Sequence, residues 1–281
     1  MPAFLTVAVS GSAPFYIKPL LKLTGTLAPS MAARILGDLV SQPRGRNPTQ
    51  PWELTGGIAG REVELRPGLF ALTWGDAGPI VLCLHGWRGR PTQFRPLGNA
   101  LLAHGFRTIS IDAPGHGRSQ GEHATPRLFG ELLIDVERIV GPTHTAVGHS
   151  FGGAAIGAAL ALGYRPGRIV LASSPTHVSR MPFAIAKMAG LPKRAFPAFA
   201  RLLEKNAGRP IEELDLVTTG PRCGIPGLLL HDRTDAVIPY REAEALMAVW
   251  PALKVMTTEG ILHRDIIGVP EVVQAVVRFI T

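Results

Sequence analysis

Short apolar runs alternate with longer segments of helical periodicity from about Glu62 to the end of the chain. The run at 80–84 contains no polar side chain apart from a thiol, as expected for a strand buried on both faces of a sheet. Such alternation predicts an α/β fold: a mostly parallel sheet with helices on both faces. The expected strands are 62–66, 69–74, 80–84, 108–112, 144–147, 168–172, 227–231 and 254–257, and the expected helices are 91–104, 126–140, 153–163, 240–250 and 270–279.

Two segments fall outside this alternation. Residues 1–56 carry two amphipathic helical stretches, near 15–23 and 30–40, and then a connector rich in proline, arginine and glycine at 42–51. Residues 176–222 interrupt the pattern between the sixth and seventh strands and hold helical pieces at 181–188 and 196–206. We therefore expect an N-terminal helical arm (1–56) and an α/β domain (57–281) with a small helical cap inserted at about 176–222. The cap should lie over the C-terminal edge of the sheet, where open α/β sheets bind ligands.

The composition fits one large globular domain. The chain has 281 residues, of which 46% are hydrophobic and 18% charged, and its two cysteines exclude a disulfide framework or a cysteine-rich zinc site. The first charged residue is Lys18, so the apolar start lacks the basic region of a secretory signal. The uncharged stretch 139–164 is broken by Gly148, Ser150 and Gly152, which favours a strand, a turn and a buried helix over a membrane span. We expect a cytoplasmic protein.

The net charge of +8 is unevenly distributed. Residues 1–61 and residues 176–222 each contribute +4, while the rest of the chain is neutral overall. A nucleic-acid binder would place a basic stripe on its folded body, so nucleic acid is not an expected partner. Attraction to anionic lipid or to an anionic substrate remains open.

The strongest chemical signal is the run Gly148 to Gly152, GHSFG, which fits the pattern G-x-S-x-G. It follows an apolar strand and opens a helix of small residues, which is the context that a nucleophile elbow needs. The flanking glycines allow a tight turn in which backbones approach closely, and the hydroxyl of Ser150 projects at the top of the sheet. The start of the following helix favours negative charge that develops there.

With four further segments, this motif makes residues 62–281 resemble the α/β-hydrolase superfamily. In chain order the segments are His85-Gly86-Trp87, the run 112–119 (DAPGHGRS), the run 231–239 (HDRTDAVIP) and the run 260–264 (GILHR). The resemblance implies a triad of Ser150, Asp235 and His263, in the chain order that this fold uses. It also implies an oxyanion hole made by the backbone N–H groups of Trp87 and Phe151. One departure is Asp232, which stands where a glycine is usual and competes with Asp235 for the role of the triad acid.

The resemblance implies a serine hydrolase that cleaves carboxylic esters or thioesters through an acyl-serine intermediate, without a metal or cofactor. An acyl-CoA-type thioesterase is one alternative, and a non-enzymatic small-molecule sensor or scaffold on the same fold is another. Five apolar side chains of the cap are candidates for binding the acyl group, although their helical spacing fits packing within the cap equally well. These residues are Met181, Phe183, Met188, Phe196 and Phe199.

Two further alternatives concern partners. The arm at 1–56 either packs on the body as structural cover or lies on an anionic membrane surface through 15–23, with Lys18 and Lys22. The basic residues of the cap either form a solvated face or steer an anionic, acyl-bearing substrate toward Ser150. The sequence leaves the oligomeric state open.

Overall fold

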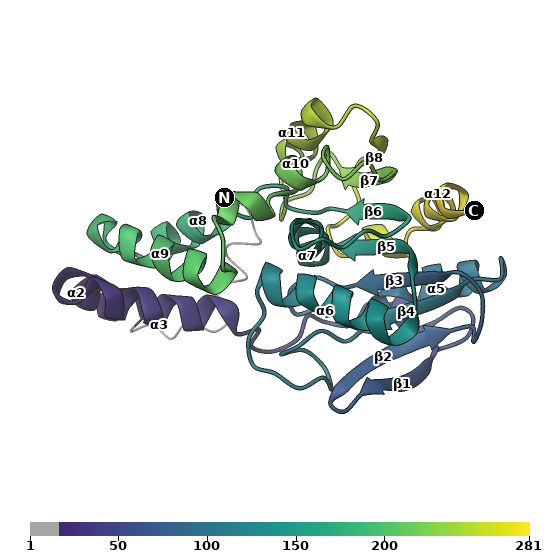
Figure 1. The fold of residues 1–281 in the computed structure, drawn as a ribbon, viewed down its shortest axis with the longest axis horizontal. Helices are drawn as coiled ribbons and strands as arrows, with labels where there is room; N and C mark the ends of the chain where they lie inside the picture. Colours follow the sequence, from purple (N-terminus) through teal and green to yellow (C-terminus); the bar gives the residue numbers. More distant parts are fainter. Residues whose placement is uncertain (1–16) are drawn as a thin grey trace.

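The computed structural model of the protein describes residues 17–281, and these residues contain one eight-stranded sheet. Its strand order is β1-β2-β4-β3-β5-β6-β7-β8 (Figure 1). β2 pairs antiparallel with β1 and β4, and all other neighbours are parallel. The strands are β1 (Arg61–Arg66), β2 (Leu69–Trp74), β3 (Ile80–Leu84), β4 (Arg107–Ile111), β5 (Thr143–His149), β6 (Arg168–Ala172), β7 (Gly227–Asp232) and β8 (Lys254–Thr258). The predicted mostly parallel sheet is confirmed.

Helices cover both faces of the sheet because alternate strand side chains point to opposite sides. In β3, Val81 and Cys83 pack under α5 (Arg95–Leu102) and α12 (Pro270–Ile280). Leu82 and Leu84 pack on the other face. That face is covered by α6 (Pro126–Val140), α7 (Phe151–Ala161), α10 (Leu216–Thr219) and α11 (Arg241–Val249). The residues of α7 from 151 to 160 are all buried, as expected for a helix that is apolar all round.

Several element boundaries differ from the expected ones, most clearly at 91–104 and around Ser150. The segment expected as one helix at 91–104 begins as a 3-10 helix, η1 (Pro91–Phe94), and α5 begins only at Arg95. Pro96 lies in the first turn of α5, where its missing N–H has no partner to lose, so it favours a new helix start. The segment around Ser150 is tighter than expected: β5 runs to His149 and α7 starts at Phe151, so Ser150 alone forms the junction.

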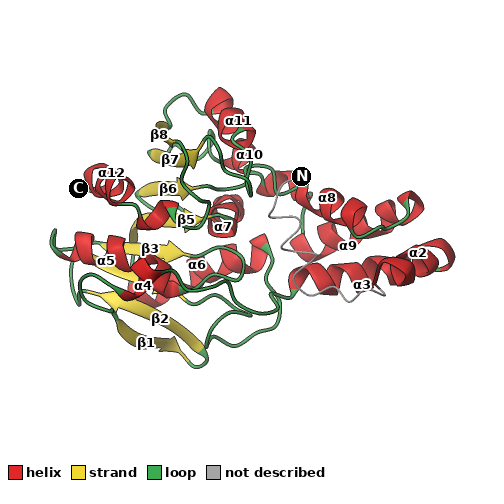
Figure 2. Ribbon diagram, turned by 180° about the vertical axis from the view of Figure 1, so that it is seen from behind, coloured by secondary structure: helices red, strands yellow, loops and turns green. Residues whose placement is uncertain are grey.

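A separate group of four helices projects from one end of the sheet (Figures 1 and 2). We call it the helical lobe: α2 (Ile17–Leu27), α3 (Pro29–Ser41), α8 (Met181–Met188) and α9 (Phe196–Ala207). The arm and the insertion thus share one apolar core, which includes Leu21, Leu36 and Phe199. α3 and α9 approach closely at Gly37, where an added Cβ would stand 2.8 Å from Cδ2 of Leu202. Phe15, expected in the first helix, lies outside the described residues.

Two carboxylates, the buried Asp215 and the partly buried Glu242, hold the insertion on the body. Asp215 accepts hydrogen bonds from the backbone N–H and the hydroxyl of Ser179, at 2.9 and 2.7 Å, and so joins the two ends of the insertion. Glu242 on α11 accepts bonds from the N–H and hydroxyl of Thr176, at 2.9 and 2.7 Å. None of the helices between Ile17 and Thr281 combines the length and apolar character needed to cross a bilayer.

The register of the sheet brings the chemistry-bearing loops together. Leu84 of β3 pairs with Ile111 of β4 and with Gly148 of β5, so these three strands end side by side. The loops that begin at His85 and Asp112, and the turn at Ser150, therefore meet at the carboxyl edge of the sheet. The short elements α4 (Pro51–Leu54), η2 (Lys193–Ala195), η3 (Ile211–Leu214) and η4 (Ile266–Gly268) complete the fold.

Candidate active site

Ser150 occupies a strained backbone conformation, with φ 55° and ψ −121°. A non-glycine residue with positive φ costs free energy, and such residues concentrate at functional sites. Three glycines make this turn possible by keeping neighbouring backbones close. An added Cβ would come within 2.6 Å of the backbone of Gly152 at Gly148, within 2.1 Å of the carbonyl of Leu84 at Gly152, and within 1.9 Å of Ser174 at Gly153.

The loops after β7 and β8 bring two side chains to Ser150. Nε2 of His263 lies 3.0 Å from Oγ of Ser150, and Nδ1 of the same ring lies 2.7 Å from Oδ2 of Asp235. The Asp235 side chain is inaccessible to solvent, and that of His263 is 9% exposed. The structure therefore brings the three residues of the expected triad into one hydrogen-bonded chain.

Asp235 is held as a carboxylate by its surroundings. Burial pushes the pKa of Asp235 upward, but the hydrogen bond and charge of His263 and two backbone N–H groups outweigh it, so the pKa lies below its usual 3.8. The two N–H groups belong to Val237 and Ile238, which donate to Oδ1 at 2.8 and 2.9 Å. With Oδ1 occupied in this way, Oδ2 is left to orient the imidazole.

Asp232 binds the backbone around His263 and makes no contact with the imidazole. Its carboxylate accepts bonds from the N–H groups of Gly260 and Ile261, at 3.2 and 2.9 Å, and from the hydroxyl of Thr258 at 2.8 Å. It also accepts from the N–H and hydroxyl of Thr234. Burial opposes ionisation, yet these bonds lower the pKa of Asp232 to about 2. Asp232 thus caps its own turn through Thr234 and ties that turn to the loop that carries His263.

His149 fixes the main chain of His263 from the other side. Its Nε2 lies 2.9 Å from the carbonyl oxygen of His263, and the two rings are 5.1 Å apart at their centroids. Burial and the neighbouring His263 lower the pKa of His149 to about 3, so the ring is neutral and donates from Nε2. Apart from the position of His149 next to the serine, no feature of the sequence indicated this contact.

The loop after β3 lies directly against Ser150. A Cβ added to Gly86 would stand 2.8 Å from Cβ and 3.3 Å from Oγ of Ser150. The rings of Trp87 and Phe151 pack edge to face with centroids 5.5 Å apart, so the two residues expected to supply oxyanion N–H groups are neighbours. The histidine of this loop, His85, bonds to two backbone groups: Nδ1 donates to the carbonyl of Gly86 at 2.8 Å, and Nε2 accepts from the N–H of Ala113 at 3.2 Å.

The connector between the helical lobe and β1 passes over this loop. The side-chain N–H of Asn47 donates to the carbonyl of Trp87 at 3.0 Å, and the backbone N–H of Asn47 donates to the carbonyl of Arg88 at 3.0 Å. Further along, Nε1 of Trp52 donates to Oδ1 of Asp265 at 3.2 Å. The connector and α4 thus bond to the two loops that flank Ser150, a role that sequence patterns alone did not indicate.

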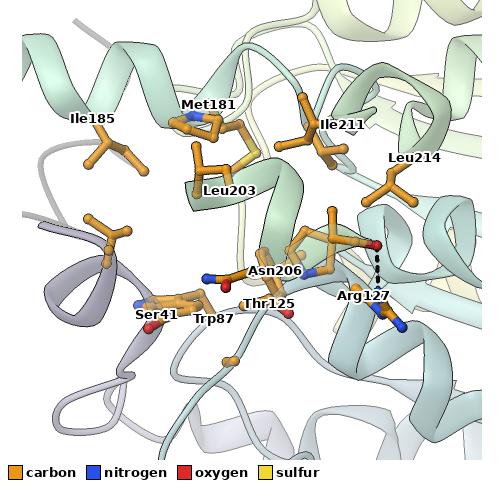
Figure 3. Close-up of a pocket in the computed structure, with 18 residues that line it drawn as sticks. Ser41, Trp87, Thr125, Arg127, Met181, Ile185, Leu203, Asn206, Ile211 and Leu214 are labelled. Carbon is orange, nitrogen blue, oxygen red and sulfur yellow. Dashed lines mark hydrogen bonds between the residues drawn. The ribbon is translucent and has the colours of Figure 1, made fainter. Parts of the chain in front are cut away.

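Two cavities meet at Trp87. The triad cavity, of about 50 Å³, is lined by Ser150, His263, Asn47 and Trp87 among others. The lobe cavity, of about 110 Å³, lies between the helical lobe and the body (Figure 3). Its walls are mainly apolar: Val40 of α3, Met181 and Ile185 of α8, Leu203 of α9, and Ile211, Leu214, Trp87 and Phe151. At one side Arg127 donates to the carbonyl of Ala207 at 2.7 Å, which closes that wall.

Of the five cap residues considered for the acyl group, Met181 lines the lobe cavity. Phe199 is fully buried in the core of the lobe, and Met188 and Phe196 pack against the same core. Phe183 is 36% exposed, and its ring lies 6.2 Å from that of Phe196. Met188, Phe196 and Phe199 thus pack within the lobe, whereas Phe183 lies at its surface. Within residues 17–281, no group of three or more histidine, cysteine, aspartate or glutamate side chains is arranged to hold a metal ion.

Comparison with known sequences places the chain among hydrolases. The sequence model of the alpha/beta hydrolase family matches residues 81–274. A serine hydrolase-like protein of Danio rerio is 36% identical over 86 residues, which cover 28% of this chain and 26% of that protein. The chain thus spans about a quarter of the length of this relative. A pimeloyl-[acyl-carrier protein] methyl ester esterase of Xanthomonas axonopodis pv. citri is 26% identical over 245 residues, covering 72% of this chain and 95% of that enzyme.

Comparison with solved structures shows the same fold. A monoacylglycerol lipase of Paleococcus ferrophilus superposes with a TM-score of 0.58 and 21% identity, covering 75% of this chain and 98% of that one. A thioesterase domain from the curacin biosynthetic pathway superposes with a TM-score of 0.56 and 16% identity, covering 80% and 100%. At these identities the likeness concerns the fold alone.

Proposed function

The chain belongs to the alpha/beta hydrolase family, and on this premise we propose that it is a serine hydrolase that cleaves carboxylic esters through an acyl-serine intermediate. The proposal rests above all on one observation: Oγ of Ser150, the imidazole of His263 and the carboxylate of Asp235 form an unbroken chain with spacings of 3.0 and 2.7 Å. A serine hydroxyl becomes a competent nucleophile when a base within hydrogen-bond reach takes its proton.

In the acylation step, Oγ of Ser150 attacks the ester carbonyl carbon while Nε2 of His263 takes the hydroxyl proton. Asp235 holds Nδ1–H and stabilises the imidazolium that forms. The carbonyl oxygen becomes an oxyanion, for which the N–H groups of Trp87 and Phe151 are the proposed donors. When the tetrahedral intermediate collapses, the bond to the alcohol oxygen breaks, and Nε2–H returns the proton to the leaving alkoxide.

Deacylation uses the same groups in reverse order. A water molecule takes the place of the alcohol, His263 accepts one of its protons, and the hydroxide adds to the acyl carbonyl. Collapse breaks the bond to Oγ and releases the carboxylic acid, while the imidazole returns the proton to Ser150. His149 and Asp232 are positioning residues in this scheme, since each bonds to the backbone near His263.

The lobe cavity is the proposed site for the apolar part of the ester. The side chains of Trp87 and Phe151 line it, and the backbone N–H groups of the same two residues are the proposed oxyanion donors. A carbonyl held by those donors therefore lies next to apolar walls formed by α3, α8 and α9. Apolar walls stabilise a hydrocarbon chain by removing its surface from water.

The methyl ester esterase relative acts on an ester, as its name states, and supports ester cleavage here. The alternatives of an acyl thioesterase and of a non-catalytic sensor use the same side chains, so activity decides among them. We would measure turnover of p-nitrophenyl esters from acetate to long acyl chains, and of acyl-CoA thioesters, with the wild type and with Ser150→Ala. Ester turnover that Ser150→Ala abolishes is the expected result. Turnover of thioesters alone, or of neither class, would contradict the proposal.

A further inference from the structure

The outer face of α2 presents a row of exposed leucines. Leu20, Leu23 and Leu27 stand at helical spacing and are 38%, 61% and 76% exposed, and Met31 at the start of α3 is 54% exposed. The opposite face of α2 carries Leu21, which is fully buried in the core of the lobe. α2 thus has two apolar faces, and packing within the lobe accounts for one of them.

The charges around this row have a single sign. The segments 17–36 and 181–203 together contain seven basic and no acidic residues. All seven basic side chains are exposed: Lys18, Lys22, Arg34, Lys187, Lys193, Arg194 and Arg201. The first acidic residues that follow, Asp38 and Glu204, belong to the last turns of α3 and the later part of α9.

The fold gathers these two segments at the end of the lobe that is remote from the sheet. The C-terminal ends of α3 and α9 contact the body, where Ser41 bonds to His123 at 2.9 Å and Arg127 bonds to Ala207 at 2.7 Å. At the other end, an added Cβ on Gly25 would stand 2.6 Å from Pro192, the residue before Lys193. Both views place α2 farthest from the sheet (Figures 1 and 2). The leucines and the basic residues thus form one surface, which we call the lobe tip.

We propose that the lobe tip docks on the surface of an anionic lipid bilayer, with the leucines of α2 inserted and the basic residues among the headgroups. This proposal does not depend on the proposed ester chemistry. Apolar side chains on one helix face and lysines on another match the pattern of helices that lie in a membrane interface. A protein partner fits less well, because protein–protein interfaces are enriched in aromatic residues and depleted in lysine.

The test uses the full-length protein and sedimentation or flotation with vesicles. One set contains phosphatidylglycerol and phosphatidylcholine in equal parts, and the other contains phosphatidylcholine alone. We expect binding to the anionic vesicles that weakens with added salt, and little binding to the neutral ones. Lys18→Gln/Lys22→Gln should lower the partition coefficient by about fivefold for each charge removed. Leu20→Gln/Leu23→Gln/Leu27→Gln should remove binding, while circular dichroism remains that of the wild type.

Matched controls lie elsewhere on the surface. Ile139→Gln/Val249→Gln replaces two apolar side chains that are each 43% exposed, and Arg66→Gln/Arg278→Gln replaces two exposed basic ones. Both controls should bind vesicles as the wild type does. The proposal would be overturned by no binding to anionic vesicles, or by binding that the lobe-tip variants leave unchanged. It would also be overturned if the wild type does not bind lipid but forms a dimer in sedimentation equilibrium that the leucine variant dissociates. Binding that depends on residues 1–16 but not on the leucines of α2 would also overturn it.

Discussion

The side-chain amide of Asn47 donates a 3.0 Å hydrogen bond to the carbonyl oxygen of Trp87. The peptide that this bond fixes lies beside a strained residue, because Arg88 has a positive φ of 58°. Asn47 also donates its own N–H to the carbonyl of Arg88 at 3.0 Å, so both carbonyls of this turn are held by one residue. A residue far from the motifs in sequence thereby orients the loop that faces Ser150.

Asn47→Ala should lower kcat for ester cleavage by about ten- to hundredfold, because displacing the N–H of Trp87, the proposed oxyanion donor, by a fraction of an ångström weakens transition-state stabilisation. KM should change by a smaller factor. Asn47→Asp, which keeps the size of the side chain but replaces the donating amide with a carboxylate, should behave similarly. Steady-state kinetics measure the effect. Arg44→Ala, at an exposed position of the same connector, is the control and should retain wild-type kcat. A wild-type kcat in all three variants would show that Asn47 does not position the loop.

The two aspartates of the acid-bearing loop should separate in their effects. Asp235→Asn should lower kcat by about 10⁴-fold, because the amide no longer stabilises the productive imidazole tautomer. Asp232→Asn should retain most of the activity, because Asp232 bonds to backbone groups and not to the imidazole. The opposite order of kcat values would assign the triad acid to Asp232.

Asp232→Asn should instead lower Tm in a pH-dependent manner. The pKa of Asp232 is lowered from 3.8 to about 2, so its carboxylate contributes stability above about pH 4 that is lost as the pH falls through 2. The difference in Tm between wild type and variant should therefore be full at neutral pH and shrink as the pH approaches 2. Calorimetry over this range measures it, and a difference independent of pH would contradict the assignment.

Buried neutral histidines should make the fold weaken in mild acid. Burial lowers the pKa of both His149 and His116 from 6.5 to about 3. Above about pH 6.5 each ring is neutral in the folded and in the unfolded chain, so neither ring reduces the stability there. Below that pH the unfolded chain binds protons that the folded chain does not, and each group costs about 1.4 kcal/mol per pH unit. Urea unfolding between pH 7 and pH 4 should show this slope, and His149→Gln should reduce it. An unchanged slope in His149→Gln would mean that the ring titrates freely in the folded protein.

Residues that line the lobe cavity should affect substrate choice, whereas residues in the core of the lobe should affect stability. Met181→Trp should lower kcat/KM for long-chain esters and spare acetate, because the larger side chain fills the cavity. Phe199→Ala should cost about 3–5 kcal/mol of folding free energy, because it leaves a void in the core of the lobe. The ester panel and urea unfolding separate the two effects. A chain-length preference that Met181→Trp does not alter would place the acyl group elsewhere.

The sequence predicted those parts of the fold and of the site that a local residue pattern specifies. Strand–helix alternation predicted the sheet, and the resemblance to the α/β-hydrolase superfamily implied that Ser150, Asp235 and His263 meet. Parallel strands place the loops after them at one edge of the sheet. The amphipathic patterns at 30–40 and 196–206 likewise predicted helices. They could not show that α3 packs on α9, since an apolar face indicates that a partner exists but not which one.

Contacts between distant segments could not be predicted, because a local pattern does not identify the partner of a segment. Asn47 lies in the proline-rich connector at 42–51 and Trp52 lies in the short helix α4 that follows it. Only the folded chain brings them to Trp87 and Asp265. Phe196 and Phe199 have the same apolar character as Met181, so the sequence could not tell cavity lining from packing. The only sequence feature that pointed to the strained backbone at Ser150 was the pair of flanking glycines, which indicated a tight turn.

The most direct test of the proposed mechanism is labelling with a fluorophosphonate, followed by mapping of the modified peptide by mass spectrometry. We predict one adduct per chain, on Ser150, that is absent in Ser150→Ala and forms far more slowly in His263→Ala, because the hydroxyl then lacks its base. Folded Asp232→Asn should label at nearly the wild-type rate. Failure of the wild type to label, or an adduct that persists in Ser150→Ala, would contradict Ser150 as the nucleophile.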